Sequence, residues 1–168
     1  MPVVGLIGTD LLTRRDDMVV AVDPFDGKTK SVVAKAMTPD IAVFHAVAAD
    51  RHGNVSCGYD SEAVILAEAS GHVVVTAERI VDHIGEKDAQ GTFIPGIHVD
   101  SVVHAPFGAH PGGCTGFYGQ DKIHMRDYVI ASKDDESFAE YIRAHVFEVQ
   151  NHADYIRSEE HTSELQSR

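Results

Sequence analysis

Residues 106–113 (PFGAHPGG) combine small residues with a histidine, a composition suited to close contact with a ligand. Four of these eight residues are glycine or alanine, so backbone N–H groups can approach a bound anion closely. The segment follows an expected strand, and ligands bind at the carboxyl ends of strands in open α/β sheets. We therefore expect Gly108, Ala109 and His110 to line a cleft, with His110 donating a hydrogen bond to the ligand. The alternative is a tight loop at a protein contact, in which His110 is buried with partners of its own.

Two other loops carry polar side chains that can bind a ligand. Residues 8–10 (GTD) contain Thr9 and Asp10, which either face a substrate or cap a helix. Residues 50–54 (DRHGN) contain Arg51 and His52. These two side chains can contact a phosphate group, and a salt bridge within the loop is the alternative.

Cys57, Cys114 and Glu78 are the side chains to consider as nucleophiles or acid–base groups. Two cysteines so far apart form neither a disulfide framework nor a zinc site, and each is expected to be a free, small apolar residue. A nucleophilic Cys114 would need a base and an oxyanion hole nearby, and the sequence indicates neither. Glu78 follows a buried strand, where sites in α/β proteins gather. We expect it to be a charge at a helix N-terminus or the ion-pair partner of Arg79, and not catalytic.

Eleven histidines raise the question of a metal site. His45 and His52 flank the end of an expected strand, and His104 and His110 flank the glycine-rich segment. Neither pair has the i, i+4 spacing of a zinc site on a helix. His161 falls in a C-terminal segment of unusual composition. We therefore expect no bound metal.

Composition and charge narrow the class of protein. Hydrophobic residues make up 43% of the 168-residue chain and charged residues 24%, as in a soluble domain with one core. Fourteen Lys and Arg stand against 26 Asp and Glu, a formal net charge of −12 that argues against a nucleic-acid partner. No apolar run approaches the roughly 18 residues that span a bilayer, and the N-terminus lacks a basic leader. We therefore expect a cytoplasmic protein without a membrane partner.

Short apolar runs alternate with amphipathic stretches, which is typical of an α/β domain. The run 72–76 (HVVVT) is almost wholly β-branched, as in a strand buried on both faces of a parallel sheet. Runs of this apolar kind predict strands at 18–22, 31–34, 41–46, 72–76 and 99–104.

Helical spacing of apolar residues appears in three places. Asp60 and Ser61 offer N-caps for a helix that Gly71 ends. Residues 120–131 and 135–146 predict two more helices near the C-terminus. We therefore expect an open, parallel-rich sheet flanked by helices.

Both ends of the sequence look unusual. Residues 157–168 (RSEEHTSELQSR) lack apolar periodicity, and a solvated tail is one explanation. We favour another, because codon by codon this peptide matches the translation of a common short-read sequencing adapter. On this hypothesis residues 157–168 are a non-native tail, and the domain spans residues 1–156. The chain opens on a loop-like PVVGLIGTD, so we expect Met1 to be an internal or arbitrary start, and a genuine start is the alternative.

Four stretches together resemble a known family. They are residues 8–12 (GTDLL) with 23–25 (DPF), 39–55 (PDIAVFHAVAADRHGNV), 73–82 (VVVTAERIVD) and 94–118 (IPGIHVDSVVHAPFGAHPGGCTGFY). In this order and spacing they resemble the A (alpha) subunits of glutaconate-type CoA-transferases, in family I of the CoA-transferases. The resemblance is collinear from about residue 8 to residue 146.

The resemblance implies a CoA-transferase-like α/β fold that is incomplete at its N-terminus. In this family A and B subunits pair, and the active site lies at their interface. A glutamate that belongs to the B subunit first attacks the acyl-CoA thioester, and CoA then passes through a glutamyl-CoA thioester to an acceptor acid. No catalytic residue is therefore expected on this chain, and the family's oxyanion loop lies upstream of the matched region. Acyl-CoA and a carboxylic acid are the expected substrates, and the isolated chain is expected to be inactive.

Within the resemblance, the candidate residues acquire specific roles. Gly108, Ala109 and His110 would face the substrate carboxylate or CoA, with Thr9 and Asp10 on the substrate side. Some relatives of the same shape instead hydrolyse a ring carbon–carbon bond in a CoA ester, and this activity is the first alternative. A non-catalytic ligand-sensing domain is the second alternative, although a DNA-binding segment is not visible.

Overall fold

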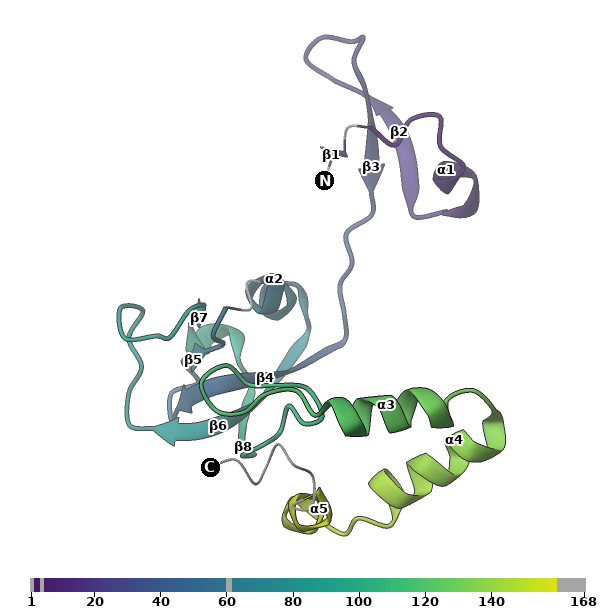
Figure 1. Ribbon diagram of the computed structural model, residues 1–168. Helices are drawn as coiled ribbons and strands as arrows, with labels where there is room; N and C mark the ends of the chain where they lie inside the picture. Colours follow the sequence, from purple (N-terminus) through teal and green to yellow (C-terminus); the bar gives the residue numbers. More distant parts are fainter. Residues whose placement is uncertain (1, 4, 60–61, 160–168) are drawn as a thin grey trace. The chain divides into compact units, whose positions relative to one another are not determined.

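The computed structural model describes residues 2–3, 5–59 and 62–159, which fall into two compact units, Met1–Thr38 and Pro39–Arg168. The first unit is a small antiparallel sheet in the order β1-β3-β2 (Figure 1). Its strands are β1 (Pro2–Val3), β2 (Met18–Val22) and β3 (Lys30–Ala34), with a short helix α1 (Leu11–Arg14) between β1 and β2. The predicted strands at 18–22 and 31–34 are therefore confirmed.

The turn between β2 and β3 forms as its sequence indicates. The Asp26 carboxylate accepts hydrogen bonds from the backbone N–H groups of Lys28 and Thr29, at 2.8 Å each. Gly27 has a φ of +65°, a left-handed conformation that glycine adopts without strain. Val32 of β3 is fully buried and forms the centre of this unit.

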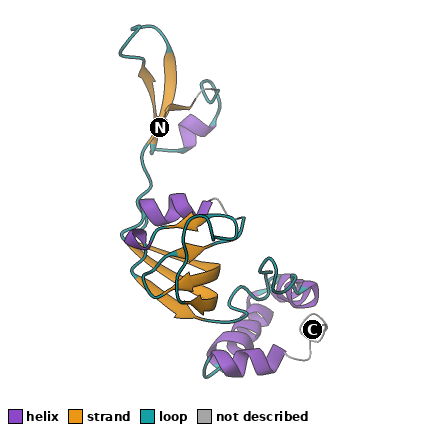
Figure 2. Ribbon diagram, turned by 90° about the vertical axis from the view of Figure 1, so that its left-hand side faces the viewer, coloured by secondary structure: helices purple, strands orange, loops and turns teal. Residues whose placement is uncertain are grey.

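The second unit is built on a five-stranded mixed sheet in the order β7-β5-β4-β6-β8. The strands β4 (Ile41–Asp50), β6 (His72–Val81) and β8 (Ser101–His104) are parallel. The strands β5 (Val55–Ser56) and β7 (Phe93–Ile94) add an antiparallel edge. This arrangement confirms the predicted α/β sheet with a parallel centre (Figure 2).

The central strands are longer than the sequence predicts, because their pairing continues past the apolar runs. The β4–β6 ladder runs from Ile41 opposite His72 to Asp50 opposite Val81. The helix α2 (Glu62–Ala69) packs on the sheet through Ala63 and Ala67, whose small side chains allow a close approach. The other buried residues of this core are Ala42, Ala46, Ala49, Val55, Cys57, Val73, Val75, Ala77 and Ile94.

Helices follow the sheet towards the C-terminus. After β8 the chain forms α3 (Lys122–Ala131) and α4 (Asp135–Ile142), as predicted, but a π-helical turn at Arg143–Phe147 replaces the expected last turn of α4. The helix α5 (His152–Glu159) includes the first three residues of the segment 157–168. The rest of that segment, and the predicted caps Asp60 and Ser61, lie outside the described residues. None of the described helices is long and apolar enough to cross a membrane.

Two aspartates cap these helices in different surroundings. Asp121 is 1% exposed and accepts hydrogen bonds from the N–H groups of Ile123 and His124, at 3.0 and 2.9 Å. Asp134 is exposed and accepts one from Ser137 N–H at 2.8 Å.

We expect Asp121→Ala to lower the free energy of unfolding by about 2–3 kcal/mol, because it removes a cap and leaves buried donors without an acceptor. Asp134→Ala serves as the matched control, and its loss should be smaller because water can replace the exposed carboxylate. Urea denaturation of both variants measures the difference. Equal losses would mean that burial adds nothing to the cap at Asp121.

Candidate functional site

A cleft of about 480 Å³ lies in the second unit, between the strands β4 and β5 and the glycine-rich segment. One wall comes from β4 and the residues after β5, and the other comes from the loop after β8. The residues lining it are His45, Val47, Cys57, Gly58, Tyr59, Ala109, Gly113, Cys114 and Thr115. The predicted loop therefore borders a cleft through Ala109, at the position where open α/β sheets bind ligands.

Glu78 lies beside this cleft, and its carboxylate is buried. Its side chain is 2% exposed and accepts hydrogen bonds from Tyr118 OH at 2.6 Å and from Phe107 N–H at 2.9 and 3.1 Å. His45 Nε2 lies 2.8 Å from the same carboxylate. The expectation of a helix N-terminus or an ion pair with Arg79 was wrong, because Glu78 lies within β6. The Arg79 guanidinium instead stands 5.1 Å from the centre of the Phe117 ring.

His45 connects Glu78 to the cleft. Its ring is 12% exposed, and its Nδ1 atom lies 2.8 Å from the Thr76 hydroxyl oxygen. With Nε2 donating to Glu78, both ring nitrogens have protein partners. The imidazole is therefore held in one orientation at the edge of the cleft.

Tyr118 joins Glu78 to the glycine-rich segment. Its hydroxyl donates to Glu78 and accepts a hydrogen bond from Ala109 N–H at 3.0 Å. Burial, and then the hydrogen bond to Glu78, raise the pKa of Tyr118 well above its usual value, so the hydroxyl keeps its proton. The Tyr118 ring also packs against Phe107, with ring centres 4.8 Å apart.

Both cysteines are buried and neither forms a disulfide, as expected from the sequence. Burial raises the pKa of the Cys114 thiol to about 11, and the negative charge of Glu78 acts in the same direction. The thiol is therefore protonated at neutral pH, whereas a nucleophilic cysteine needs the thiolate.

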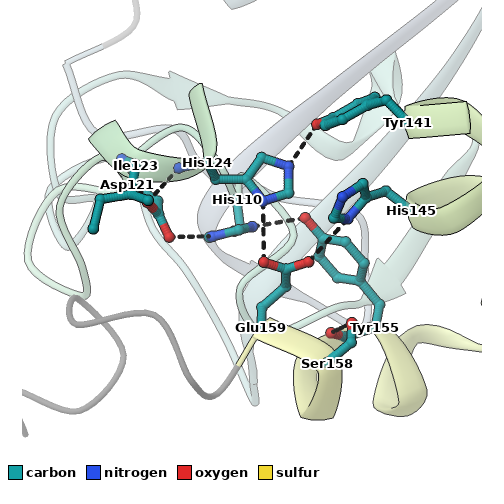
Figure 3. A network of polar contacts seen from close by, with 9 residues as sticks. All are labelled: His110, Asp121, Ile123, His124, Tyr141, His145, Tyr155, Ser158 and Glu159. Carbon is teal, nitrogen blue, oxygen red and sulfur yellow. Dashed lines mark hydrogen bonds and ion pairs between the residues drawn. The ribbon is translucent and has the colours of Figure 1, made fainter. Parts of the chain in front are cut away.

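His110 points away from the cleft that Ala109 lines. Its side chain is 3% exposed, with Nδ1 2.7 Å from the Tyr155 hydroxyl and Nε2 3.3 Å from the Asp121 carboxylate (Figure 3). Its ring meets that of His124 edge-on at 5.2 Å. Of the two interpretations of His110, the buried one with its own partners describes this geometry. Contact of His110 with a substrate stays a prediction.

Thr9 and Asp10 belong to the first unit and are exposed. The Thr9 hydroxyl donates to Leu6 O at 2.8 Å, and Asp10 forms an ion pair with Arg14 at 3.3 Å. Asp10 occupies the N-cap position of α1, but its side chain makes no capping hydrogen bond. Their substrate-side role stays a prediction.

The loop after β4 borders a second hollow, of about 580 Å³, which also involves β8. Arg51 at its rim forms an exposed ion pair with Asp82 at 2.9 Å, so a salt bridge occupies this side chain. Asp50, by contrast, is 1% exposed and fixes the loop through backbone hydrogen bonds. Among the described residues that line this hollow, Asp50 is the only buried acid–base group. The hollow therefore differs from the first cleft, which has the buried Glu78 beside it.

Two groups of described side chains bring metal-ligating atoms within 4.8 Å of one another. In the first, His45, Glu78 and Cys114, the His45 and Glu78 atoms are in direct contact at 2.8 Å and hold each other without an ion. The second, His110, His124 and Glu159, is not among the residues that line the cleft, and His124 Nδ1 contacts the Glu159 carboxylate directly at 3.0 Å (Figure 3). Neither group therefore gives reason to place a metal in the cleft.

Comparison with known proteins adds independent findings. Residues 6–105 match a family model described as Coenzyme A transferase. The A (alpha) subunit of glutaconate CoA-transferase from Acidaminococcus fermentans is 35% identical over 144 residues, which cover 84% of this chain and 45% of that protein. The IpdA subunit of the cholesterol ring-cleaving hydrolase from Rhodococcus jostii is 27% identical over 158 residues, which cover 87% of this chain and 53% of that protein.

Comparison of the fold with solved structures also finds a CoA-transferase. The crystal structure of glutaconate coenzyme A-transferase from A. fermentans superposes with a TM-score of 0.86 and 29% identity, over 96% of this chain and 56% of that one. The chain thus spans about half the length of the relatives that it matches.

Proposed function

Because the chain belongs to the coenzyme A transferase family, we propose that it is part of the non-nucleophilic A subunit of a CoA-transferase acting on short-chain carboxylic acids or diacids. The observation that carries this proposal is the similarity to the A (alpha) subunit of glutaconate CoA-transferase, in sequence and in fold. The match extends through the glycine-rich segment, the cleft and the helices after β8, because it covers 96% of the chain.

The proposed reaction begins on a partner B subunit. A glutamate carboxylate there attacks the acyl-CoA carbonyl, forming a mixed anhydride and releasing CoA thiolate. The thiolate then attacks the glutamyl carbonyl, which releases the first acid and leaves a glutamyl-CoA thioester. The acceptor carboxylate attacks this thioester, which releases CoA thiolate and forms a new mixed anhydride. The thiolate then attacks the acyl carbonyl of that anhydride, so the new acyl-CoA leaves and the glutamate carboxylate is regenerated without hydrolysis.

The chemistry of the cleft supports this division of labour. The Cys114 thiol is protonated at neutral pH, and the Glu78 carboxylate is buried with three donors of its own. Neither group is available to attack a thioester. The described part of the chain would instead shape the cleft, with Gly108 and Ala109 facing the acyl-CoA or the acceptor acid. His110, Thr9 and Asp10 remain proposed contributors, CoA is a co-substrate, and no metal is required.

The test is to co-express the complete A and B subunits and to measure CoA exchange between two acids. We expect activity from the pair only, with parallel double-reciprocal plots that indicate a ping-pong reaction. After incubation with acyl-CoA, intact-mass measurement should find CoA attached to the B subunit. CoA attached to this chain instead would refute the assignment as the non-nucleophilic partner.

Hydrolysis of a ring carbon–carbon bond in a CoA ester is the second candidate, and the 27% identity to the IpdA subunit supports it. The same complex distinguishes the two reactions. A hydrolase would consume its CoA ester without an acceptor acid, whereas a transferase requires one. The higher identity to the transferase, 35%, favours CoA transfer.

A further inference from the structure

We propose that Glu78 is the positioning residue of the glycine-rich loop, where its buried carboxylate fixes residues 107–109 against the wall of the cleft. The proposal rests on the proposed function only in taking this cleft as the place where substrate binds. Glu78 reaches neither substrate nor the reacting atoms and acts through the loop.

The first argument is the convergence of donors from distant parts of the chain. His45 comes from β4, Phe107 from the loop after β8, and Tyr118 from the far end of that loop. They lie 33, 29 and 40 residues from Glu78 in the sequence. A carboxylate that is 2% exposed is costly to bury unless it is hydrogen-bonded, and here all three donors satisfy it.

The second argument is the conformation that these contacts hold. Phe107 has a φ of +62°, a left-handed backbone that is strained for a bulky residue and persists only where its surroundings enforce it. Its N–H group is the one that donates to both oxygens of Glu78. The strained residue and the buried carboxylate therefore stabilise one another.

The third argument is the close fit of the next two residues. A Cβ atom on Gly108 would lie 2.8 Å from His45 Nδ1 and from Ala105 O, so the backbone is pressed against the imidazole that Glu78 orients. Ala109 N–H donates to the Tyr118 hydroxyl, which donates in turn to Glu78. Each of the residues 107–109 is thus held by Glu78, directly or through one side chain.

Cys114 supplies a readout that does not require activity. It lines the loop side of the cleft and is 7% exposed, whereas Cys57, 8% exposed, lines the strand side. Loosening of the loop should expose Cys114 alone, and loss of the whole fold should expose both. Alkylation of each thiol by iodoacetamide under native conditions, measured by mass spectrometry, separates the two cases.

The experiment uses the complete A subunit in complex with its B subunit. In Glu78→Gln, an amide nitrogen in place of Oε2 would stand about 3.1 Å from Phe107 N–H, two donors facing each other. We expect Cys114 alkylation to rise at least about tenfold, with Cys57 unchanged, since protection depends on local opening. We also expect KM to rise about tenfold with kcat within about threefold, because a displaced wall weakens binding more than chemistry.

Two further variants keep the test decisive. Tyr118→Phe leaves the carboxylate in place and removes only the hydroxyl that holds Ala109, so it should also raise Cys114 alkylation even if Glu78→Gln does not fold. Glu68→Gln, the same substitution at an exposed position of α2, should change none of these quantities.

Unchanged Cys114 alkylation in both loop variants would overturn the proposal, as would an equal rise at Cys57, which would indicate a role in the stability of the whole domain. If the wild-type complex transfers no CoA but Cys114 responds as expected, the proposed function fails and the positioning role stands.

Discussion

Replacing Asp50 by asparagine is expected to lower the free energy of unfolding by about 2–4 kcal/mol at pH 7, because a buried, multiply bonded carboxylate is lost. Its oxygens accept hydrogen bonds from the N–H groups of His52, Asn54 and Ile84, at 2.8, 3.0 and 2.9 Å. The Asn54 side-chain amide donates at 2.9 Å, and His83 Nδ1 lies 3.7 Å away. An asparagine would place an amide donor among these donors.

The loss should depend on pH in a defined direction. Burial alone would raise the pKa of Asp50, but the hydrogen bonds from Asn54, Ile84 and His52 outweigh it and hold the pKa below its usual value. A carboxyl group with a lowered pKa in the folded state stabilises the fold above its unfolded pKa of about 3.9. This contribution is lost as the pH falls through the folded pKa. The difference between wild type and Asp50→Asn should therefore be full at pH 7 and shrink below about pH 4.

Chemical denaturation at a series of pH values measures this effect. Asp82→Asn is the matched control, since its side chain is 97% exposed and pairs only across the surface with Arg51 among the contacts described. We expect little change from it at any pH. A loss at Asp50 that is constant from about pH 3 to pH 7 would show that the charge of the carboxylate contributes nothing.

The sequence predicted the strands well where β-branched residues dominate. It predicted the strand ends less well where a strand continues through small or charged residues. The run 72–76 predicted the start of β6, but the strand continues through Glu78 and Arg79 to Val81. A charged pair in this position argues against a buried strand when it is taken alone. The strand tolerates Glu78 because His45 and Tyr118 form hydrogen bonds with its carboxylate. These two residues lie far from Glu78 in the sequence, so the local sequence pattern does not indicate them.

The candidate site shows the same limit. Small residues in 106–113 predicted a loop beside a cleft, and Ala109 and Gly113 line one. The direction of the His110 side chain could not be predicted, because it depends on Asp121 and Tyr155, 11 and 45 residues further along the chain. Sequence reasoning likewise missed His45 as a cleft residue, since it sits inside an apolar strand and resembles a core histidine. The one available signal was its position at the carboxyl end of the predicted strand 41–46.

The close contact between Gly58 and Gly91 holds the strand-side wall of the cleft. Gly91 has a φ of +79°, and a Cβ atom added there would overlap with Gly58 O. Thr92 N–H donates to that same oxygen, and Cys57 N–H donates to Thr92 O at 2.9 Å. The backbone after β5 and the backbone before β7 are therefore in direct contact, and a side chain at Gly91 has no space.

We expect Gly91→Ala to lower the free energy of unfolding by at least about 3 kcal/mol, because backbone strain and a backbone clash act together. Gly116→Ala is the matched control. It shares a positive φ, +85°, but its nearest neighbour would be Gln90 Nε2 at 3.5 Å, an ordinary contact. Its cost should be the strain alone, about 1–2 kcal/mol.

Denaturation of both variants separates strain from clash, and equal losses would mean that the two segments move apart without cost. In that case the strand-side wall of the cleft would be adaptable, and a substrate could displace it. A larger loss at Gly91 would mean that the clash adds to the strain, because the two backbone segments cannot separate without cost and the strand-side wall of the cleft keeps its shape.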